Sequence, residues 1–380
     1  MEYRRFGRTN RRLSVITLGG MRYHDGWTQP PHELTGRMIE QCARMVQAAL
    51  DLGINHIESA QGYVKSEHCY GRVLNEELRV PRDRYFFMTK GAPETADDTH
   101  RALEAQLSAL RMDHIDLYAW HGINTKRRFD VALAKGGPVE VLKRYQEQGV
   151  IGSLGFSTHG SVRLITDAIA TDLFDFVNLH YYYFWQRNWG AILQAASHDM
   201  GVFIISPNDK GGQLFNAPAL LRDLTAPLTP IQFNARFCLA SPQIHTLSFG
   251  LTEPEHVDEM KGVFPVSVPL GPEDFEIKRR LDARVDALSA YHGYELEDDP
   301  SGINIPEVLR FRRLLKCYDM REFGRYRYNM FNPTSEWFRG EFATDERLAH
   351  VDASRAPKGI PLVEMLRETH RELFVPKPKD

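Results

Sequence analysis

The sequence predicts an α/β fold: a (β/α)8 barrel with an N-terminal β-hairpin and a C-terminal, mainly helical domain. Two observations predict the barrel. Short apolar runs recur along the first two thirds of the chain, and segments with helical periodicity lie between them. Eight strand–helix units in about 260 residues are typical of a closed barrel of parallel strands surrounded by helices. A third observation, a change of pattern near residue 265, predicts the second domain.

The predicted strands are rich in β-branched and aromatic residues, as expected for strands buried on both faces. They are Val15–Gly20, His56–Ala60, Tyr85–Lys90, His114–Trp120, Ile151–Thr158, Phe176–Tyr182, Val202–Pro207 and His245–Gly250. An open, doubly wound sheet is the alternative, and it should place a Gly-x-Gly-x-x-Gly turn after its first strand. The chain instead has Gly19-Gly20-Met21-Arg22 there, which favours the closed TIM barrel.

The segments between the strands carry the signals of helices. The clearest are Met38–Leu52, Asp97–Arg111, Pro138–Gly149 and Pro254–Gly262. The first has apolar residues at i, i+3 and i+4 spacing and stops before Gly53. Asp97 or Asp98 can cap the second, and the third opens with proline and ends at glycine.

The two ends of the predicted barrel have their own features. Tyr3–Ser14 contains the turn Gly7-Arg8-Thr9-Asn10 between two short strands, and we expect a hairpin that closes the barrel floor. Phe264–Pro272 contains proline and glycine and is predicted to be a linker. The predicted domains are therefore residues 1–265 for the barrel and residues 266–380 for the helical tail.

A weak repeat marks the tail. Gly302–Arg310 resembles Gly359–Arg367, and in both copies a proline stands where a helix is expected to begin. Between the copies, the segment 318–331 interleaves arginines with tyrosines. A nucleic-acid patch is one interpretation, and arginines packing on tyrosines is the simpler one. The formal charge of −3 gives no reason to expect a nucleic-acid partner.

Composition places the chain among soluble globular proteins, with 42% hydrophobic and 26% charged residues. No run approaches the ~18 apolar residues of a membrane span. The charged start argues against a signal peptide, so we expect a cytoplasmic protein. The cysteines are far apart and are expected to be buried free thiols rather than metal ligands: Cys42, Cys69, Cys238 and Cys317.

Reactive side chains fall where the predicted strands end, which is where barrels carry their chemistry. Glu58 and Tyr63 follow the second strand, Lys90 ends the third, and His121 follows the fourth. Each alone has a structural explanation, such as a solvated lysine cap or a loop aromatic. Together they suit carbonyl reduction, which needs a hydride from a cofactor and a proton from an acid.

The predicted roles follow from this chemistry. Tyr63 would protonate the oxygen, and Lys90 beside it would lower the pKa of the phenol. Glu58 would hold Lys90 in place, and His121 would bind and orient the carbonyl oxygen.

The segment from Gly53 to Tyr63, followed by Ser66-Glu67 and Gly71-Arg72, resembles the signature of the aldo-keto reductases. The spacing to the lysine and histidine above matches as well, and the resemblance covers about residues 1–265. It implies that these four side chains form a catalytic tetrad and that NADPH binds across the barrel rim. The family normally has Asp where this chain has Glu58.

The same resemblance implies a set of cofactor-binding residues. Ser157 and Thr158 resemble the Ser-Asn pair that holds the carboxamide, and Asn178 matches a family glutamine. The others follow the last two strands: Ser206, Lys210, Gly211, Gly212, Gly250 and His256. In the loop after the eighth strand only His256 could become cationic toward a 2′-phosphate. NADP(H) is therefore implied by the resemblance alone, and NAD(H) stays open.

Aromatic residues could wall a substrate pocket, and we expect about half of them to be structural instead. They are Tyr23, Trp27, Trp120, Tyr181, Tyr182, Tyr183, Phe184 and Trp185.

The barrel with this tail resembles an aldo-keto reductase subgroup that ends in a ferredoxin-like domain with two iron–sulfur motifs. The Cys-Pro pairs of that subgroup read Asp299-Pro300 and Ala356-Pro357 here, and Cys317 is the tail's single cysteine. A cluster typically needs four cysteine ligands, so we expect no iron–sulfur cluster. Apolar packing should hold the tail together instead, with these candidates: Leu309, Leu314, Leu315, Tyr318, Phe331, Trp337, Phe338, Leu362 and Leu366.

The sequence thus leaves three hypotheses. The first is an NAD(P)H-dependent oxidoreductase that interconverts a small aldehyde or ketone and its alcohol. The second is a regulatory or scaffold protein that binds the cofactor and does little chemistry, suggested by Glu58, Thr158 and the cysteine-poor tail. The third, an iron–sulfur electron-transfer enzyme, would need iron in the purified protein. The sequence indicates neither the oligomeric state nor the substrate.

Overall fold

The computed structural model describes residues 1–23, 26, 28–210, 212–288 and 291–376. The chain forms two compact units. The first, here called the barrel unit, comprises Met1–Gly212 and Asn234–Leu270. The second, the helical unit, comprises Gly271–Asp380 together with Gln213–Phe233. The predicted division into domains after residue 265 stays a prediction.

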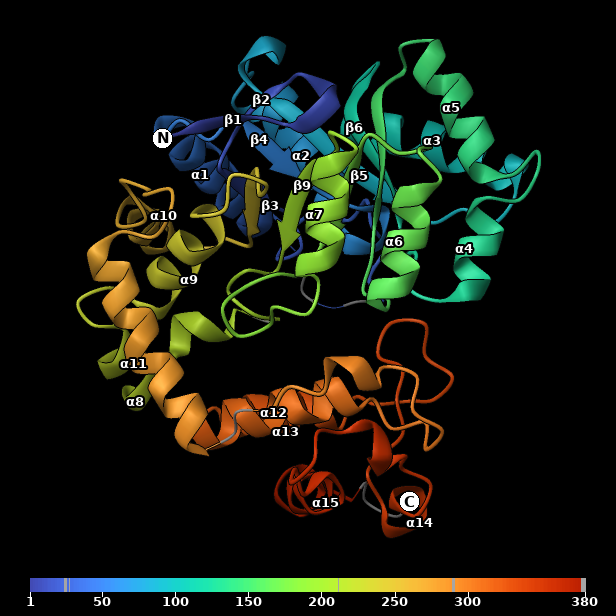
Figure 1. Cartoon of the computed structure of the whole chain (residues 1–380). Helices are drawn as coiled ribbons and strands as arrows, with labels where there is room; N and C mark the ends of the chain where they lie inside the picture. Colours follow the sequence, from blue (N-terminus) through green and yellow to red (C-terminus); the bar gives the residue numbers. More distant parts are fainter. Residues whose placement is uncertain (24–25, 27, 211, 289–290, 377–380) are drawn as a thin grey trace. The chain divides into compact units, whose positions relative to one another are not determined.

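Eight parallel strands close into a barrel, which confirms the predicted fold class (Figure 1). The strands are β3 (Ile16–Gly19), β4 (His56–Glu58), β5 (Phe86–Gly91), β6 (Ile115–His121), β7 (Ile151–Ser157), β8 (Phe176–Leu179), β9 (Gly201–Ile205) and β10 (Thr246–Phe249). They follow one another around the barrel in chain order, and β10 pairs with β3 to close it. Because the strands are parallel, their carboxyl ends all lie at one rim of the barrel.

Helices surround the barrel: α1 (Gly36–Asp51), α2 (Ser66–Arg72), α3 (Ala96–Leu110), α4 (Lys126–Ala132), α5 (Pro138–Glu147), α6 (Val162–Ala170), α7 (Trp189–Ser197) and α10 (Pro254–Lys261). Short turns are η1 (Gly7–Thr9), η2 (Gln61–Tyr63), the π-turn η3 (Val73–Glu77) and η4 (Arg82–Arg84). The predicted cap of α3 was wrong, because the Thr95 hydroxyl accepts the amide of Asp98. Asp97 and Asp98 instead lie in the first turn, where carboxylates favour the helix dipole.

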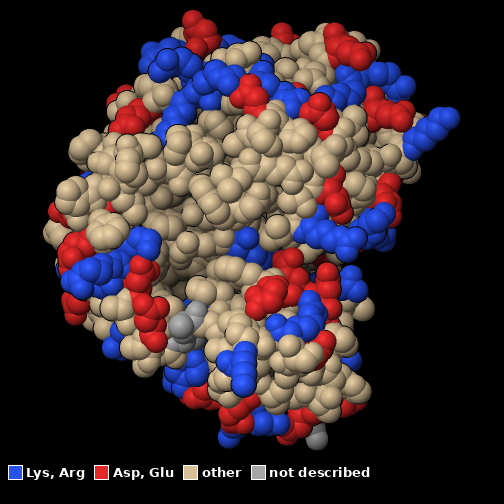
Figure 2. Space-filling model, viewed as in Figure 1, with Lys and Arg blue, Asp and Glu red and all other residues tan. Residues whose placement is uncertain are grey.

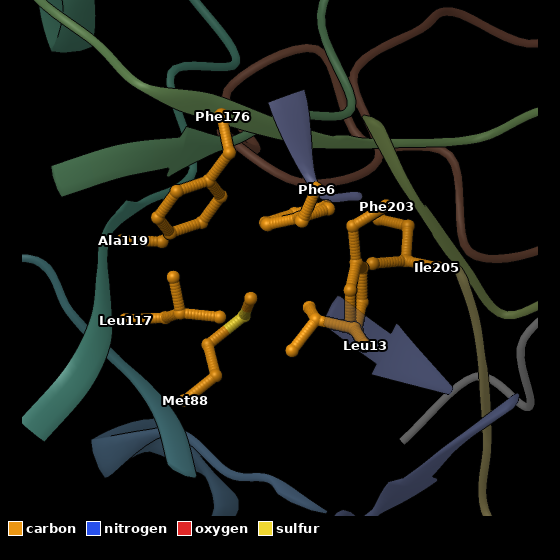
Figure 3. Close-up of a cluster of buried hydrophobic side chains, with 8 residues drawn as sticks. All are labelled: Phe6, Leu13, Met88, Leu117, Ala119, Phe176, Phe203 and Ile205. Carbon is orange, nitrogen blue, oxygen red and sulfur yellow. The ribbon is translucent and has the colours of Figure 1, made fainter. Parts of the chain in front are cut away.

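The N-terminal hairpin closes the barrel floor as expected. Its strands β1 (Tyr3–Arg5) and β2 (Arg12–Ser14) pair antiparallel. Phe6 and Leu13 are fully buried with side chains from the barrel interior, including Met88 and Phe176 (Figure 3). A Cβ on Gly7 would lie 2.3 Å from the backbone at the start of β9, so this end admits no side chain there. The opposite rim is left for a site.

The helical unit consists of α8 (Ala219–Thr225), α11 (Pro272–Leu288), α12 (Ile305–Tyr318), α13 (Arg321–Tyr328), α14 (Asp345–Leu348), α15 (Leu362–Leu373) and the turns η5 (Gln213–Asn216), η6 (Tyr294–Leu296) and η7 (Ala353–Arg355). Helix α9 (Pro230–Leu239) crosses between the units in sequence. Of the repeat's two prolines, Pro306 lies in the first turn of α12, whereas Pro361 is the residue before α15.

Helices α12, α13 and α15 pack together. Most predicted core residues of the tail are buried, among them Leu309, Leu314 and Leu366. Trp337 was predicted to be part of this core, but its side chain is 37% exposed. Lys316 adds ion pairs to Glu368 at 2.8 Å and Glu372 at 3.0 Å. These contacts join α12 to α15, the two helices that carry the sequence repeat.

The distribution of charged side chains and the burial of the cysteines agree with what the composition predicts. On the face in Figure 2, Lys and Arg side chains lie among Asp and Glu side chains. None of the described helices is both long and apolar enough to cross a membrane. All four cysteines are free and buried, as expected. Within the described residues, no group of three or more His, Cys, Asp or Glu is arranged to hold a metal ion.

Candidate active site

A pocket opens at the carboxyl ends of β3, β4, β9 and β10. It is lined by Gly19, Met21, Arg22, Glu58, Tyr63, Ile205, Ser206, Asn208, Asp209, Lys210, Ser248 and Gly250. Glu58 is the last residue of β4, and the short turn η2 that follows ends at Tyr63. The barrel therefore delivers a carboxylate and a phenol to the same cavity, at the rim where barrel enzymes work.

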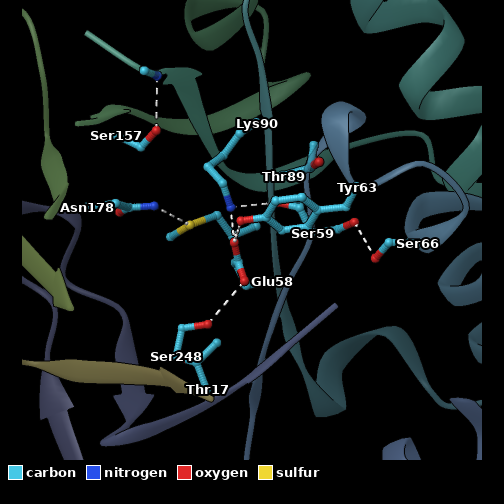
Figure 4. Close-up of polar contacts among 12 residues, drawn as sticks. Thr17, Glu58, Ser59, Tyr63, Ser66, Thr89, Lys90, Ser157, Asn178 and Ser248 are labelled. Carbon is cyan, nitrogen blue, oxygen red and sulfur yellow. Dashed lines mark hydrogen bonds and ion pairs between the residues drawn. The ribbon is translucent and has the colours of Figure 1, made fainter. Parts of the chain in front are cut away.

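Glu58 lies at the centre of the polar contacts (Figure 4). Its Oε1 accepts hydrogen bonds from the Lys90 ammonium and, at 3.3 Å, from the Tyr63 hydroxyl. Lys90 also donates to the carbonyl of Ser59 at 2.8 Å. Only 3% of Glu58 and 1% of Lys90 is exposed, so the ion pair is almost fully desolvated. The predicted partnership of these two residues is present in the structure.

The contact between Lys90 and Tyr63 differs from the prediction. The ammonium nitrogen lies over the phenol ring, 4.9 Å from its centre, and the phenol donates to Glu58. Enclosure in the pocket raises the pKa of Tyr63 above its ordinary value, because burial disfavours the phenolate. The predicted net lowering of this pKa is therefore wrong, because burial outweighs the effect of the Lys90 charge. Glu58 instead places its carboxylate against the phenol hydroxyl.

Burial also governs the charges of the two basic groups. It lowers the pKa of Lys90 well below the ordinary value, and the positive charge of Lys210 acts in the same direction. The pKa of His121 is well below its ordinary value, first through burial and then through the charges of Lys90, Arg128 and Lys210. His121 is therefore neutral at pH 7 and able to donate one hydrogen bond.

The ring of His121 packs near the ring of Tyr63. Their ring centres are 6.0 Å apart, and the rings are nearly perpendicular. Arg128 braces the strand end behind the histidine, because its guanidinium donates to the carbonyls of His121 at 2.6 Å and Gly122 at 2.5 Å. The structure thus brings together all four side chains of the predicted tetrad.

The predicted carboxamide-binding residues lie on β7, directly after it, and on β8. Ser157 and Asn178 are partners in the strand register, and both are buried. The Ser157 hydroxyl accepts a hydrogen bond from the amide of Gly122 at 3.1 Å. Thr158 directly follows β7, and its hydroxyl donates to the carbonyl of Ile123 in the loop after β6 at 2.6 Å. Asn178 donates to the sulfur of Met88, and its Oδ1 is buried without a hydrogen-bond partner.

The loop after β9 contributes Ser206 and Lys210 to the pocket. Ser206 has φ of 53° and Gly212 has φ of 75°, and the amides of Lys210 and Gly212 donate to the Oδ1 and the carbonyl of Asp209. The Lys210 ammonium lies 3.4 Å from Nε2 of His159. Gly211 lies outside the described residues.

The loop after β10 offers no cation for a 2′-phosphate. Gly250 lines the pocket, but Nδ1 of His256 accepts the amide of Thr252 at 3.2 Å. Partial burial lowers the pKa of His256 despite three neighbouring carboxylates. The expectation that His256 could become cationic is thus not supported near pH 7.

Several predicted pocket aromatics have structural roles. Trp120 is fully buried and donates to the carbonyl of Pro93 at 3.2 Å. Tyr23 is fully buried against Tyr70, with ring centres 5.4 Å apart. The remaining candidates on the β8 side are also buried: Tyr181, Tyr182, Tyr183, Phe184 and Trp185. Trp27 lies outside the described residues.

Sequence reasoning missed several pocket residues: Gly19, Met21, Arg22, Ile205, Asn208, Asp209 and Ser248. Ser248 carried a usable signal, because it is a polar residue within an otherwise mostly apolar strand, one residue from the strand's carboxyl end. The loop residues carried none, since their approach to the pocket depends on the path of the loops.

Residues 15–212, more than half of the chain, match the model of the aldo/keto reductase family. The chain belongs to that family. It is 28% identical over 170 residues to the 6-dehydroglucose reductase of Novosphingobium aromaticivorans, covering 41% of this chain and 51% of that protein. It is 30% identical over 145 residues to an aldo-keto reductase of Mycolicibacterium smegmatis, covering 37% and 49%. The chain thus spans about half the length of these curated relatives.

Solved structures share the fold. An aldo-keto reductase from Bacillus halodurans superposes with a TM-score of 0.60 at 19% identity, covering 74% of this chain and 96% of that one. An aldo/keto reductase from Klebsiella pneumoniae, solved with NADP and acetate, gives a TM-score of 0.58 at 20% identity and covers 74% and 95%. At these identities the likeness supports the barrel architecture.

Proposed function

We propose that the protein is an NAD(P)H-dependent oxidoreductase that reduces a small aldehyde or ketone to the alcohol, with Tyr63 as the proton donor. The observation that carries the proposal is the meeting of Tyr63, Glu58, Lys90 and His121 at the carboxyl-end rim. Membership of the aldo/keto reductase family supports it.

The residues of the rim fit a nicotinamide cofactor. The buried Oδ1 of Asn178 lacks a partner, and an acceptor there suits the amide protons of a carboxamide. The positive charge of Lys210 and the hydroxyl of Ser206, which both line the pocket, suit the pyrophosphate. A bound cofactor would supply the hydride for the carbonyl carbon. Either NADPH or NADH fits this proposal, because His256 adds no charge near pH 7.

The chain's own residues would manage the substrate oxygen. Neutral His121 donates a hydrogen bond that orients the carbonyl and stabilises charge developing on its oxygen. The Tyr63 hydroxyl, which donates to Glu58 in the structure, turns toward that oxygen; its O–H bond then breaks and the proton joins the oxygen, which becomes the alcohol hydroxyl. Glu58 orients the phenol and keeps Lys90 in place, and the Lys90 charge near the ring stabilises the phenolate that remains.

The test is turnover on a panel of aldehydes and ketones, together with fluorescence titrations of NADPH and NADH. We expect Tyr63→Phe to lower kcat at least about 100-fold while cofactor affinity changes little. Tyr3→Phe is the matched control, because Tyr3 lies in the hairpin at the opposite end of the barrel. Undiminished turnover of Tyr63→Phe would refute the mechanism. Cofactor binding with no turnover on any substrate would favour the regulatory alternative.

We further propose that the helical unit derives from a ferredoxin-like domain that has lost its clusters. The two repeat copies form α12 and α15, which pack together, and Cys317 is the single cysteine of the tail. Iron analysis of protein purified without oxygen tests this, and stoichiometric iron would contradict it.

A further inference from the structure

Glu58 has a third partner that the proposed mechanism does not use. While Lys90 and Tyr63 share Oε1, the hydroxyl of Ser248 on β10 donates to Oε2 at 3.1 Å (Figure 4). Ser248 is 8% exposed and lines the same pocket. Each oxygen of the carboxylate therefore has its own donors.

Gly19 on β3 makes this contact feasible. The strand order is β10, β3, β4, so β3 lies between Ser248 and Glu58. Gly19 is the register partner of Glu58, and a Cβ on it would lie 2.8 Å from the Ser248 hydroxyl and 3.2 Å from Oε2. Because this position has no side chain, the serine and the glutamate meet across the intervening strand.

The buried carboxylate depends on this hydroxyl. Among the described residues, the Ser248 hydroxyl is the group that donates a hydrogen bond to Oε2 of Glu58. A buried charged oxygen without a donor is costly. Without Ser248 the side chain would gain by turning about its terminal torsion, since that torsion has a broad energy profile. The turn would redistribute the bonds that Oε1 now makes to Lys90 and Tyr63.

We propose that Ser248 is a positioning residue for the reaction: by binding Oε2 it directs Oε1 of Glu58 toward Lys90 and Tyr63 together. The inference rests on the proposed function, because the phenol oriented in this way is the proposed proton donor. It assigns the serine a role through the glutamate and no direct role with substrate or cofactor.

A double-mutant cycle tests the proposal with Ser248→Ala, Glu58→Asp and the double variant. Aspartate is one methylene shorter and should lose its reach to the serine. We expect Ser248→Ala to lower kcat about tenfold, as for loss of one hydrogen bond to a charged group. KM and NADPH affinity should change less than about twofold, because uniform binding is not affected. In the Glu58→Asp background the same change should alter kcat less than about twofold.

Two controls accompany the cycle. Ser248→Thr restores a hydroxyl and should recover most of kcat. Ser153→Ala removes a buried hydroxyl on β7 that contacts Arg11, away from Glu58, and should leave kcat unchanged. An equal loss of kcat from Ser248→Ala in both backgrounds would overturn the proposal, as would a large loss of NADPH affinity, which would place the serine at the cofactor.

The same four proteins separate this inference from the proposed function. If the wild type reduces no carbonyl, the proposed function fails, and urea unfolding still measures whether the two side chains act together. We then expect Ser248→Ala to lower the unfolding midpoint in the wild type but much less in the Glu58→Asp background. Equal shifts of the unfolding midpoint in both backgrounds would show that Ser248 and Glu58 are not energetically coupled, and would overturn the inference.

Discussion

His56 makes the stability of the barrel sensitive to acid. It lies on β4, is fully buried, and has ring contacts to Phe6 and Phe203. Its Nδ1 is 2.8 Å from the Thr17 hydroxyl, whereas its Nε2 is buried without a partner. Burial, with smaller contributions from the charges of Lys90 and Arg11, lowers the pKa of His56 to about 3.

The sign follows from the depressed pKa. In the unfolded chain His56 has its ordinary pKa of 6.5, so between about 6.5 and about 3 the unfolded state binds the extra proton. Each pH unit in that window removes about 1.4 kcal/mol from the free energy of unfolding. A fall from pH 7 to pH 5 should therefore remove about 2 kcal/mol through this residue alone. Above about pH 6.5 the residue makes no pH-dependent contribution.

The assay is urea unfolding at pH 7, 6 and 5, followed by tryptophan fluorescence. Trp120 and Trp185 are almost fully buried in the barrel unit and report on its unfolding. His56→Asn keeps a hydrogen-bonding group near Thr17 and removes the titration, so its loss between pH 7 and pH 5 should be about 2 kcal/mol smaller than that of the wild type. The exposed His32→Asn is the control and should behave like the wild type. Equal losses in His56→Asn and the wild type would refute the reasoning.

Three further predictions concern the site and its supporting helices. Lys90→Met should lower the free energy of unfolding by about 3–5 kcal/mol, because it leaves the Glu58 carboxylate buried and unpaired. Adding Glu58→Gln should restore most of this loss, and urea unfolding measures both effects. Gly71→Ala should lower the melting temperature by several degrees, since its Cβ would lie 2.1 Å from a backbone oxygen of α3, whereas Gly36→Ala, with open space around it, should not. Because the pKa of Tyr63 is raised, kcat/KM for reduction should stay within about twofold from pH 6 to pH 9. Over the same range kcat/KM for alcohol oxidation should rise about tenfold per pH unit. A fall in kcat/KM for reduction below pH 9 would contradict this prediction.

The periodicity of the sequence was sufficient for the barrel. Strands buried on both faces must be short and continuously apolar, and that pattern identified all eight. The hairpin was equally accessible, because the turn Gly7-Arg8-Thr9-Asn10 lies between two short strands ahead of the first barrel strand. The tail was harder to predict. Packing of Trp337 depends on the path of a loop, which residue type and spacing do not determine.

The sequence was sufficient to predict which residues form the candidate site, but not the hydrogen bonds between them. Polar residues at strand ends must converge once the barrel closes, so Glu58, Tyr63, Lys90 and His121 were within reach of sequence reasoning. The bond from Ser248 to Glu58 was not, because it requires the closing register of β10 with β3 and an unoccupied position at Gly19. Side-chain torsions and barrel closure are properties of the folded chain.

The replacement of Asp by Glu at position 58 bears on the direction of the proposed reaction. A proton donor must hold its proton at working pH, and a phenol that donates to a buried carboxylate does so over the whole physiological range. Tyr63 is therefore protonated when reduction begins. As negative charge develops on the carbonyl oxygen beside His121, that oxygen becomes basic enough to take the proton of the phenol. Oxidation would need the phenolate, which burial and the nearby charge of Glu58 both disfavour. If the proposed function holds, alcohol oxidation at neutral pH draws on a small population of phenolate, so its rate should rise with pH while the rate of reduction should not.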